Sequence, residues 1–403
     1  MLDAEDVRAA RERVAETARH TPTEYSHSLS ELTGADVHLK LETFQRTGAF
    51  KIRGATNRIA TLPEETRDRG IVTASAGNHA QGVALAASRL GVDALVVMPE
   101  GAPVSKVKAT KNYGAEVVLH GVDYDGAAAR AREIEREQGL YYLHAFDDPM
   151  VMAGQGTLGL EVVEDRPEVD TVVVPVGGGG LISGVATAVK DHDPSVRVVG
   201  VQAEGAASLP QSLERGERVT LDAVDTIADG IATRSVGERT FEVIRERVDE
   251  AVTVADDDTA LALTTLLERE KTLVEGAGAV ALAAVLAEAF DYDDGETVVP
   301  LLCGGNIDMN TLTTVIVRGL VNTGRYLRLR TTLVDRPGAL LDLTDVIAGH
   351  RANIYAIRHD RTSRNVAMND AEVELDLETR GPEHVAELTD ALEAAGYEVE
   401  ILL

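Results

Sequence analysis

The chain of 403 residues has no tryptophan, a single cysteine and aromatic residues at only 3% of its positions. One cysteine, Cys303, excludes a disulfide within the chain and suits a reducing compartment, so we expect a cytoplasmic protein. No apolar run approaches the roughly 20 residues that a helix needs to cross a bilayer. The acidic first residues also lack the basic and apolar regions of a signal peptide. The sequence therefore predicts a globular protein with no membrane partner.

Basic residues are scarce as well. The chain has 39 Lys and Arg against 67 Asp and Glu, a formal net charge of −28 that is spread along its length. Because binding of phosphate backbones requires basic patches, we expect no nucleic-acid partner. Only seven residues are lysine, and an acid excess with so little lysine resembles proteins of salt-loving (halophilic) archaea. Molar salt shortens the screening length to ~3 Å, so we expect this self-repelling chain to lose structure in dilute buffer.

Motifs for several common chemistries are missing. The sequence contains no paired-cysteine motif and no His-Glu-x-x-His segment, and its ten histidines are scattered, so no metal site is expected. No Gly-x-Ser-x-Gly element indicates an acyl hydrolase.

What the sequence does contain is an alternation of short apolar runs with helical periods. Strands alternating with helices predict parallel sheets that are covered by helices on both faces. A long helical stretch at 150–164 separates two groups of strands, which predicts two α/β lobes with a cleft between them. The predicted strands are 37–42, 71–74, 94–98, 116–119, 171–176, 196–202, 251–254 and 297–302. The predicted helices include 4–19, 51–60, 80–90, 105–113, 124–138 and 181–190.

Three of these strands end in glycine-rich turns that lead towards helices. Ligands of open α/β sheets lie at the carboxyl ends of strands, and backbone N–H groups at helix starts bind anions. One such turn is a packing device as often as a site, but three in one chain favour a shared cleft. The longest turn consists of Gly177, Gly178, Gly179 and Gly180. Its backbone can wrap an anion closely, although Glu204, at the end of the next strand, keeps a dinucleotide-binding dehydrogenase open as an alternative.

The turn after strand 71–74 suits a carboxylate, because N–H groups open the next helix and two side chains can add hydrogen bonds. Its residues are Ser75, Ala76, Gly77, Asn78 and His79. A helix-capping role for Asn78 is an equal alternative, and His79 is expected to be structural. Cys303 in the third turn is either a buried core thiol or a group that presents its sulfur to a ligand.

Lys51 opens the predicted helix 51–60. A lysine that reacts with a carbonyl compound needs its amine in a largely desolvated pocket. Its neighbours Phe50 and Ile52 suit that need, although most helical lysines are solvated surface charges.

These motifs together resemble the threonine ammonia-lyases (threonine dehydratases), which are fold-type II enzymes that use pyridoxal 5'-phosphate. The matching segments are Ala-Phe-Lys-Ile-Arg-Gly around Lys51, Ser-Ala-Gly-Asn-His-Ala-Gln-Gly from Ser75, the four glycines, and Cys-Gly-Gly-Asn from Cys303. The resemblance covers 1–320 and implies a two-lobed, tryptophan-synthase-β-like α/β fold. A smaller lobe at about 52–148 would be inserted in a larger lobe made of 1–51 and 149–320.

The resemblance also implies roles. Lys51, beside Phe50, would hold the cofactor as a Schiff base and remove the substrate's Cα proton. The four glycines and Leu181 would bind the cofactor's phosphate, Asn78 its phenolic oxygen, and Cys303 would face its pyridine nitrogen. The turn 75–79 would bind the substrate carboxylate. A neutral thiol holds the ring proton poorly, which we expect to favour β-elimination over racemisation.

One departure bears on the reaction. Serine racemases of this fold carry a second serine where this chain has Ala76, so racemisation is expected to be slow. Their divalent-cation site would use Glu204 and an acid near Pro210, and the proline argues against that metal.

After Arg325 the pattern changes to a βαββαβ order, which is ferredoxin-like. The expected elements are strand 325–335, a helix to 350, strands 352–361 and 366–378, helix 382–396 and strand 397–402. With Asp-Arg-Pro-Gly-Ala-Leu from Asp335, the segment 325–403 resembles an ACT domain, a module that commonly binds amino acids between paired copies. Gly338 and Asn353 are the predicted ligand contacts. An oligomerisation module without a ligand is the alternative.

The sequence thus predicts β-elimination of L-threonine to 2-oxobutanoate and ammonia, with L-serine converted to pyruvate as a second activity. Isoleucine or valine is the expected effector, because 2-oxobutanoate feeds isoleucine synthesis in this family. We expect a homodimer or homotetramer. The alternatives are a serine or hydroxyaspartate dehydratase or racemase of the same fold, and a non-catalytic amino-acid sensor.

Overall fold

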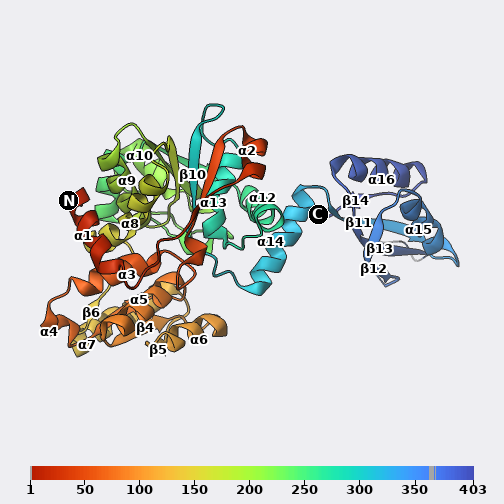
Figure 1. Ribbon diagram of the computed structural model, residues 1–403. Coiled ribbons are helices and arrows are strands. Elements are labelled where there is room, and N and C mark those ends of the chain that lie inside the picture. The colour runs from red at the N-terminus through yellow and green to blue at the C-terminus, as the bar shows by residue number, and fades with distance from the viewer. Residues whose placement is uncertain (1, 363–366, 368) are drawn as a thin grey trace. The chain divides into compact units, whose positions relative to one another are not determined.

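Figure 1 shows a computed structural model, which describes residues 2–362, 367 and 369–403. The chain divides into two units, Met1–Asp308 and Met309–Leu403. The second unit begins earlier than the residue 325 expected from the sequence. The reason is that helix α14 (Met309–Asn322) contacts strand β11 (Tyr326–Val334) of the same unit.

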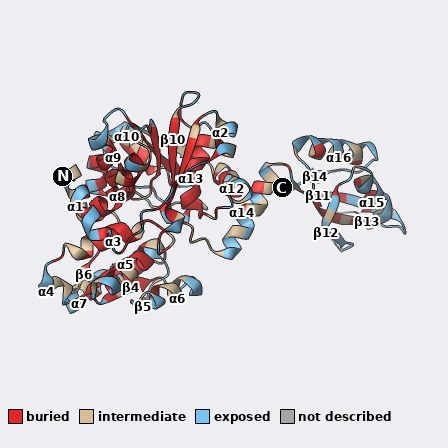
Figure 2. Cartoon of the chain, viewed as in Figure 1, coloured by how far each residue is buried: buried red, intermediate tan, exposed pale blue. Residues whose placement is uncertain are grey.

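A six-stranded sheet forms the centre of the first unit, in the order β1-β2-β10-β7-β8-β9. All neighbouring pairs are parallel except the edge pair β1–β2. Helices cover both faces of such a sheet, so its central strands β2, β7, β8 and β10 are almost completely buried, whereas the edge strands β1 and β9 are partly exposed (Figure 2). The strands are β1 (Thr23–Tyr25), β2 (Asp36–Leu41), β7 (Thr171–Pro175), β8 (Arg197–Ala203), β9 (Glu250–Val254) and β10 (Thr297–Leu302).

A second, four-stranded parallel sheet in the order β5-β4-β3-β6 is formed by the segment between helices α3 (Lys51–Ala60) and α8 (Pro149–Asp165). It has its own apolar core, which includes Ile71, Val83 and Met98. The prediction of two groups of parallel strands is therefore confirmed. The strands are β3 (Ile71–Ala74), β4 (Ala94–Met98), β5 (Glu116–Leu119) and β6 (Tyr141–Tyr142).

The helices of the first unit follow the predicted alternation. Helix α1 ends at Val14, because the N–H of Thr17 bonds the carbonyl of Val14 in a tighter turn, so the prediction of a helix to residue 19 was wrong. The helices are α1 (Ala4–Val14), α2 (His27–Thr33), α3 (Lys51–Ala60), α4 (Glu64–Arg67), α5 (Asn78–Leu90), α6 (Val104–Asn112), α7 (Tyr124–Gln138), α8 (Pro149–Asp165), α9 (Gly180–His192), α10 (Ser208–Arg215), α11 (Glu238–Arg247), α12 (Asp256–Thr265) and α13 (Gly276–Leu286).

The second unit contains the predicted βαββαβ order after α14, with an antiparallel sheet in the ferredoxin-like order β12-β13-β11-β14. Leu327, Leu329 and Leu333 alternate with more exposed residues along β11 and form the core with both helices. Residues 366 and 368, at the predicted start of the third strand, lie outside the described residues. The remaining elements are α15 (Ala339–Gly349), β12 (Asn353–Asp360), β13 (Asp370–Glu378), α16 (Pro382–Ala394) and β14 (Glu400–Ile401). Within the described parts of both units, no helix combines the length and the apolar character that crossing a membrane requires.

Candidate active site

The loop before α3 is bonded to the turn that follows β10. The N–H of Phe50 donates to the carbonyl oxygen of Cys303 (3.2 Å), and Ala49 pairs with Gly304 in an isolated β-bridge. Phe50 also packs in the same buried cluster as Leu181 and Cys303. The fold therefore brings the predicted Lys51 turn and the predicted Cys303 turn together.

Lys51 is half-buried, and its surroundings suit a reactive amine. Its Nζ donates to the carbonyl oxygen of Ala145 (3.3 Å) and lies 5.1 Å from the centre of the Phe50 ring. Desolvation lowers the pKa of Lys51 from 10.5 to about 8, against the opposing influence of Cys303 and Glu275. More of the neutral, nucleophilic amine is therefore present near neutral pH than for a surface lysine.

The four-glycine turn packs against Phe146, the residue that follows Ala145. A Cβ added to Gly178 would lie 2.4 Å from the Phe146 ring, and Gly179 has a φ of 91°, so side chains are excluded at both positions. Within the described part of the chain, the backbone N–H groups of residues 177–180 donate no hydrogen bond. These donors open helix α9 without a side-chain cap. The turn is thus an open anion cradle that is linked to Lys51 through Ala145 and Phe146.

The turn after β3 is bonded to the same cluster through Asn78. Its Nδ2 donates to Oε1 of Glu275 (2.5 Å), and its Oδ1 accepts from Nδ2 of Asn306 (2.8 Å). The residue that precedes helix α5 is Gly77, so the capping alternative for Asn78 was wrong. Ser75 accepts from the N–H of Gly77 through its Oγ (3.2 Å), which closes a tight turn in front of the helix.

His79 is held away from ligand chemistry. Its Nε2 lies 3.1 Å from the hydroxyl of Thr73 and 3.4 Å from the carbonyl oxygen of Leu143. Burial lowers the pKa of His79 to about 3, with a further contribution from the charge of Lys51, so the ring is neutral. Among the described residues its Nδ1 is buried without a hydrogen-bond partner, and its backbone N–H at the start of α5 is left for a ligand.

The structure confirms the first of the two descriptions of Cys303, a buried core thiol; the description of a sulfur presented to a ligand stays a prediction. Its side chain belongs to the buried core, and it follows the last residue of β10. Its Sγ donates to the carbonyl oxygen of Ala277 (3.2 Å), and burial raises the pKa of the thiol far above its ordinary value. The group is therefore a neutral thiol at the site.

Two further side chains complete this cluster: Asn306, which the sequence analysis quoted in the Cys-Gly-Gly-Asn segment without a role of its own, and Glu275, which it missed. Glu275 is only 4% exposed although it is a carboxylate. Burial and the charge of Asp229 raise its pKa to about 7, against the N–H groups of Asn78 and Asn306 and the charge of Lys106. The one signal in the sequence was an acid placed directly before the apolar helix α13.

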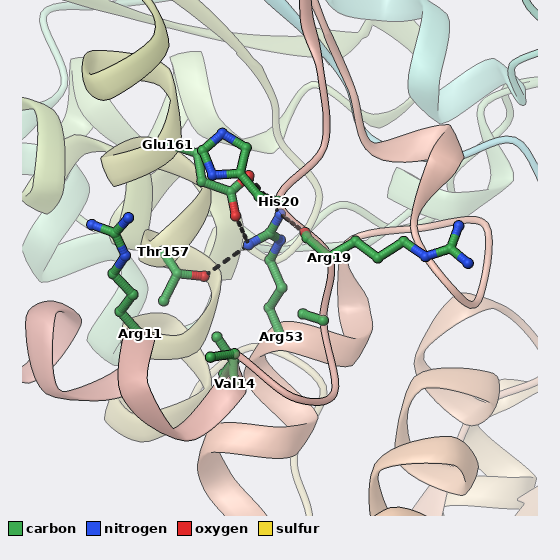
Figure 3. A pocket seen from close by; sticks show the side chains of 9 residues that line it. Arg11, Val14, Arg19, His20, Arg53, Thr157 and Glu161 are labelled. Carbon is green, nitrogen blue, oxygen red and sulfur yellow. Dashed lines mark hydrogen bonds and ion pairs between the residues drawn. The ribbon is translucent and has the colours of Figure 1, made fainter.

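Arg53 anchors the Lys51 helix on its other side. Two residues along a helix correspond to about 200° of rotation, so Arg53 points away from the Lys51 amine. Figure 3 shows its guanidinium bonded to Glu161 and Thr157, and Glu42 also accepts from it. The adjoining cavity of about 210 Å³ lies among residues of α1, α3 and α8. Because Arg53 is 1% exposed and bonded on all three nitrogens, it supports the helix rather than a ligand.

In the second unit, the predicted ligand contacts occupy element starts. Gly338 has a φ of 91° directly before α15, and Asn353 begins β12 and donates from Nδ2 to Glu378 (2.9 Å). Among the described residues, no group of three or more His, Cys, Asp and Glu side chains could hold a metal ion.

Comparisons with known proteins agree with this geometry. The family model of pyridoxal-phosphate dependent enzymes matches residues 14–304. The chain is 49% identical to an L-threonine ammonia-lyase of Geobacter sulfurreducens over 402 residues, covering 100% of both chains. Among solved structures, the processed form of threonine deaminase isoform 2 from Solanum lycopersicum gives a TM-score of 0.76 at 41% identity, covering 79% of this chain and 87% of the other. Maize serine racemase gives a TM-score of 0.75 at 37% identity, covering 80% and 98%.

Proposed function

The chain belongs to the pyridoxal-phosphate dependent enzymes, and on that premise we propose that it is a threonine ammonia-lyase that converts L-threonine to 2-oxobutanoate and ammonia. The observation that carries the proposal is the meeting of a partly desolvated Lys51 amine, an open glycine turn and Asn78 around one site. Identity of 49% to an L-threonine ammonia-lyase along the whole chain supports the same activity.

The residues present fit the cofactor. Gly177, Gly178, Gly179 and Gly180 offer unbonded N–H groups to a phosphate, and a side chain at Gly178 would collide with Phe146. Leu181 and Phe50 supply apolar walls, and Asn78 retains one N–H for the phenolic oxygen. The neutral Cys303 would face the pyridine nitrogen. Bound pyridoxal phosphate would withdraw electrons from the substrate's Cα, which would make the Cα proton easier to remove.

Lys51 would carry the cofactor covalently and then take the Cα proton. A pKa near 8 serves both tasks, because the amine releases its proton readily and can accept one again near neutral pH. The turn 75–79 would hold the substrate carboxylate with backbone N–H groups of Ala76 and Asn78. These contacts are common to threonine and serine, so we propose L-serine as a second substrate.

A racemase is the second candidate, because maize serine racemase has a similar structure. Ala76 argues against it, since a methyl group cannot deliver a proton to the second face of the substrate. We therefore propose elimination as the main reaction.

We further propose that the second unit contains an ACT-like regulatory domain of about 325–403 that binds isoleucine or valine between paired copies in a homodimer or homotetramer. Its βαββαβ order supports the domain type. Gly338, directly before α15, and Asn353, at the start of β12, are the proposed contacts. The rest of the chain, about 1–320, would be the catalytic part of a cytoplasmic, salt-adapted enzyme.

Keto-acid release tests the proposal. Purified protein with pyridoxal phosphate is assayed with L-threonine, L-serine and hydroxyaspartate, and chiral analysis of the serine reaction detects any D-serine. We expect the largest kcat/KM with L-threonine, little D-serine, and loss of activity in Lys51→Ala. A preference for serine or hydroxyaspartate, or racemisation faster than elimination, would replace the proposed function by its alternatives.

A further inference from the structure

A chain of side-chain hydrogen bonds runs through the site from the loop before Lys51 to a buried carboxyl group. The carbonyl oxygen of Thr47 accepts from Nδ2 of Asn306 (2.7 Å), and the same Nδ2 donates to Oδ1 of Asn78 (2.8 Å). Nδ2 of Asn78 then donates to Glu275 (2.5 Å). The four residues come from four separate segments, which precede α3 and α13, open α5 and follow β10, so the chain of bonds ties these segments together at the candidate site.

The direction of these bonds fixes the orientation of both amides. A backbone carbonyl can only accept, so Asn306 must present its nitrogen to Thr47 and therefore to Asn78. Asn78 must then present its oxygen to Asn306 and its nitrogen to Glu275. An amide nitrogen carries two N–H groups. One N–H of Asn78 is used by Glu275, and the second is left for a ligand.

The backbone around Glu275 leaves space for its carboxyl group. A Cβ added to Gly304 would lie 2.4 Å from Oε1 of Glu275, and one added to Gly230 would lie 3.4 Å away. The backbone of Asn306 also bonds the carboxyl group. Two glycines thus leave room for a carboxyl group that is only 4% exposed.

We propose that Glu275 is a positioning residue that holds Asn78 with its free N–H towards the cofactor's phenolic oxygen, and that the charge of Glu275 strengthens this hold. This inference rests on the proposed function, because it assigns a role towards the cofactor. It concerns residues that the motifs around Lys51 and the glycine turn do not contain.

The charge of Glu275 is expected to change within the working range of an enzyme. Its pKa of about 7 follows from burial and from Asp229, and it is opposed by Asn78, Lys106 and the backbone of Asn306. As pH rises through about 7, Glu275 becomes charged, and a charged carboxylate accepts the hydrogen bond from Asn78 more strongly than a neutral carboxyl group does.

Three variants separate positioning from mere packing. Glu275→Gln keeps an oxygen that can accept from Asn78 but removes the charge. Glu275→Ala removes the acceptor, and Asn306→Ala frees the other end of the Asn78 amide. Glu296→Gln is the matched control, because Glu296 also accepts a side-chain hydrogen bond but precedes β10 at the end opposite Cys303.

The readouts are the dissociation constant of pyridoxal phosphate and the pH dependence of the bound cofactor's absorbance. We expect Glu275→Gln to bind within about threefold of the wild type but to lose the absorbance change near pH 7, and both Ala variants to bind at least about tenfold more weakly. Circular dichroism of each apoprotein identifies a variant that has not folded. If Glu275→Ala is unfolded, the cofactor affinity of Asn306→Ala tests the positioning role instead.

Two results would overturn the inference. One is an unchanged absorbance profile in Glu275→Gln, which would exclude a role for the charge. The other is wild-type cofactor affinity in a folded Ala variant, which would exclude positioning. A wild type that takes up no pyridoxal phosphate would instead contradict the proposed function itself, so the two failures are distinguishable.

Discussion

Replacing Lys51 by methionine should stabilise the apoprotein. The amine is a desolvated cation in the folded chain, and methionine of similar length has no charge to desolvate. A pKa that is displaced from 10.5 to about 8 corresponds to about 3 kcal/mol of unfavourable free energy for the charged form. Lys51 is half-buried, so solvent screening lowers this figure, and we expect a gain of about 2 kcal/mol near neutral pH.

Thermal unfolding measured by circular dichroism provides the assay. A unit of roughly 300 residues has an unfolding entropy of about 0.6 kcal/mol per kelvin, so Lys51→Met should raise the Tm by about 3 °C. Lys108→Met, which replaces an exposed lysine in α6, is the control and should change the Tm by less than about 1 °C.

The pH dependence tests the cause of the gain. Between about pH 8 and pH 10.5 the native Lys51 is neutral while the unfolded lysine still binds a proton. The stability of the wild type therefore rises with pH in this window relative to that of Lys51→Met. The advantage of the variant should shrink by about 1 kcal/mol between about pH 7 and about pH 9. A variant that is less stable than the wild type at pH 7, or an advantage independent of pH, would refute a desolvated amine at this position.

Three further predictions concern other parts of the first unit and the whole chain. Arg53→Met leaves Glu42 and Glu161 buried without their partner, so it should cost about 3–5 kcal/mol in stability, measured as a fall in Tm; an unchanged Tm would show that the ion pairs are not formed. Gly178→Ala places a methyl group against Phe146, so the affinity for pyridoxal phosphate should fall at least about tenfold with the secondary structure retained; Gly101→Ala, at a glycine with open space around its Cβ position and no positive φ, is the control for cofactor binding. With a net charge of −28, the protein should unfold in dilute buffer; a Tm that is the same in low and in molar salt would contradict this.

The sequence predicted the bounds of several elements correctly, although helices α13 and α14 were not among the predicted elements. Strands β3, β4, β5 and β10 and helices α3 and α7 have the predicted bounds, because continuous apolar runs and helical periods mark them locally. Strands β1 and β6 were missed. They contain three and two residues, and only their pairing with β2 and β3 makes them strands. Pairing partners so distant in the chain leave no local pattern.

The residues of the candidate site also differ in how far the sequence could predict them. Lys51 and the glycine turns stand out because each requires a particular residue in a short motif. Glu275 and Asn306 meet Asn78 across 197 and 228 residues, and nothing local marks those contacts. The capping role considered for Asn78 failed for the same reason, since a distant carboxylate competes for its amide.

Chemical trapping of the cofactor tests the central claim most directly. The wild-type protein is incubated with pyridoxal phosphate, reduced with borohydride, digested and analysed by mass spectrometry. The chain offers seven lysines: Lys40, Lys51, Lys106, Lys108, Lys111, Lys190 and Lys271. We predict one stoichiometric phosphopyridoxyl group on Lys51 that is absent from Lys51→Met. Labelling that is spread over the exposed lysines, or that is concentrated on a lysine other than Lys51, would contradict the account.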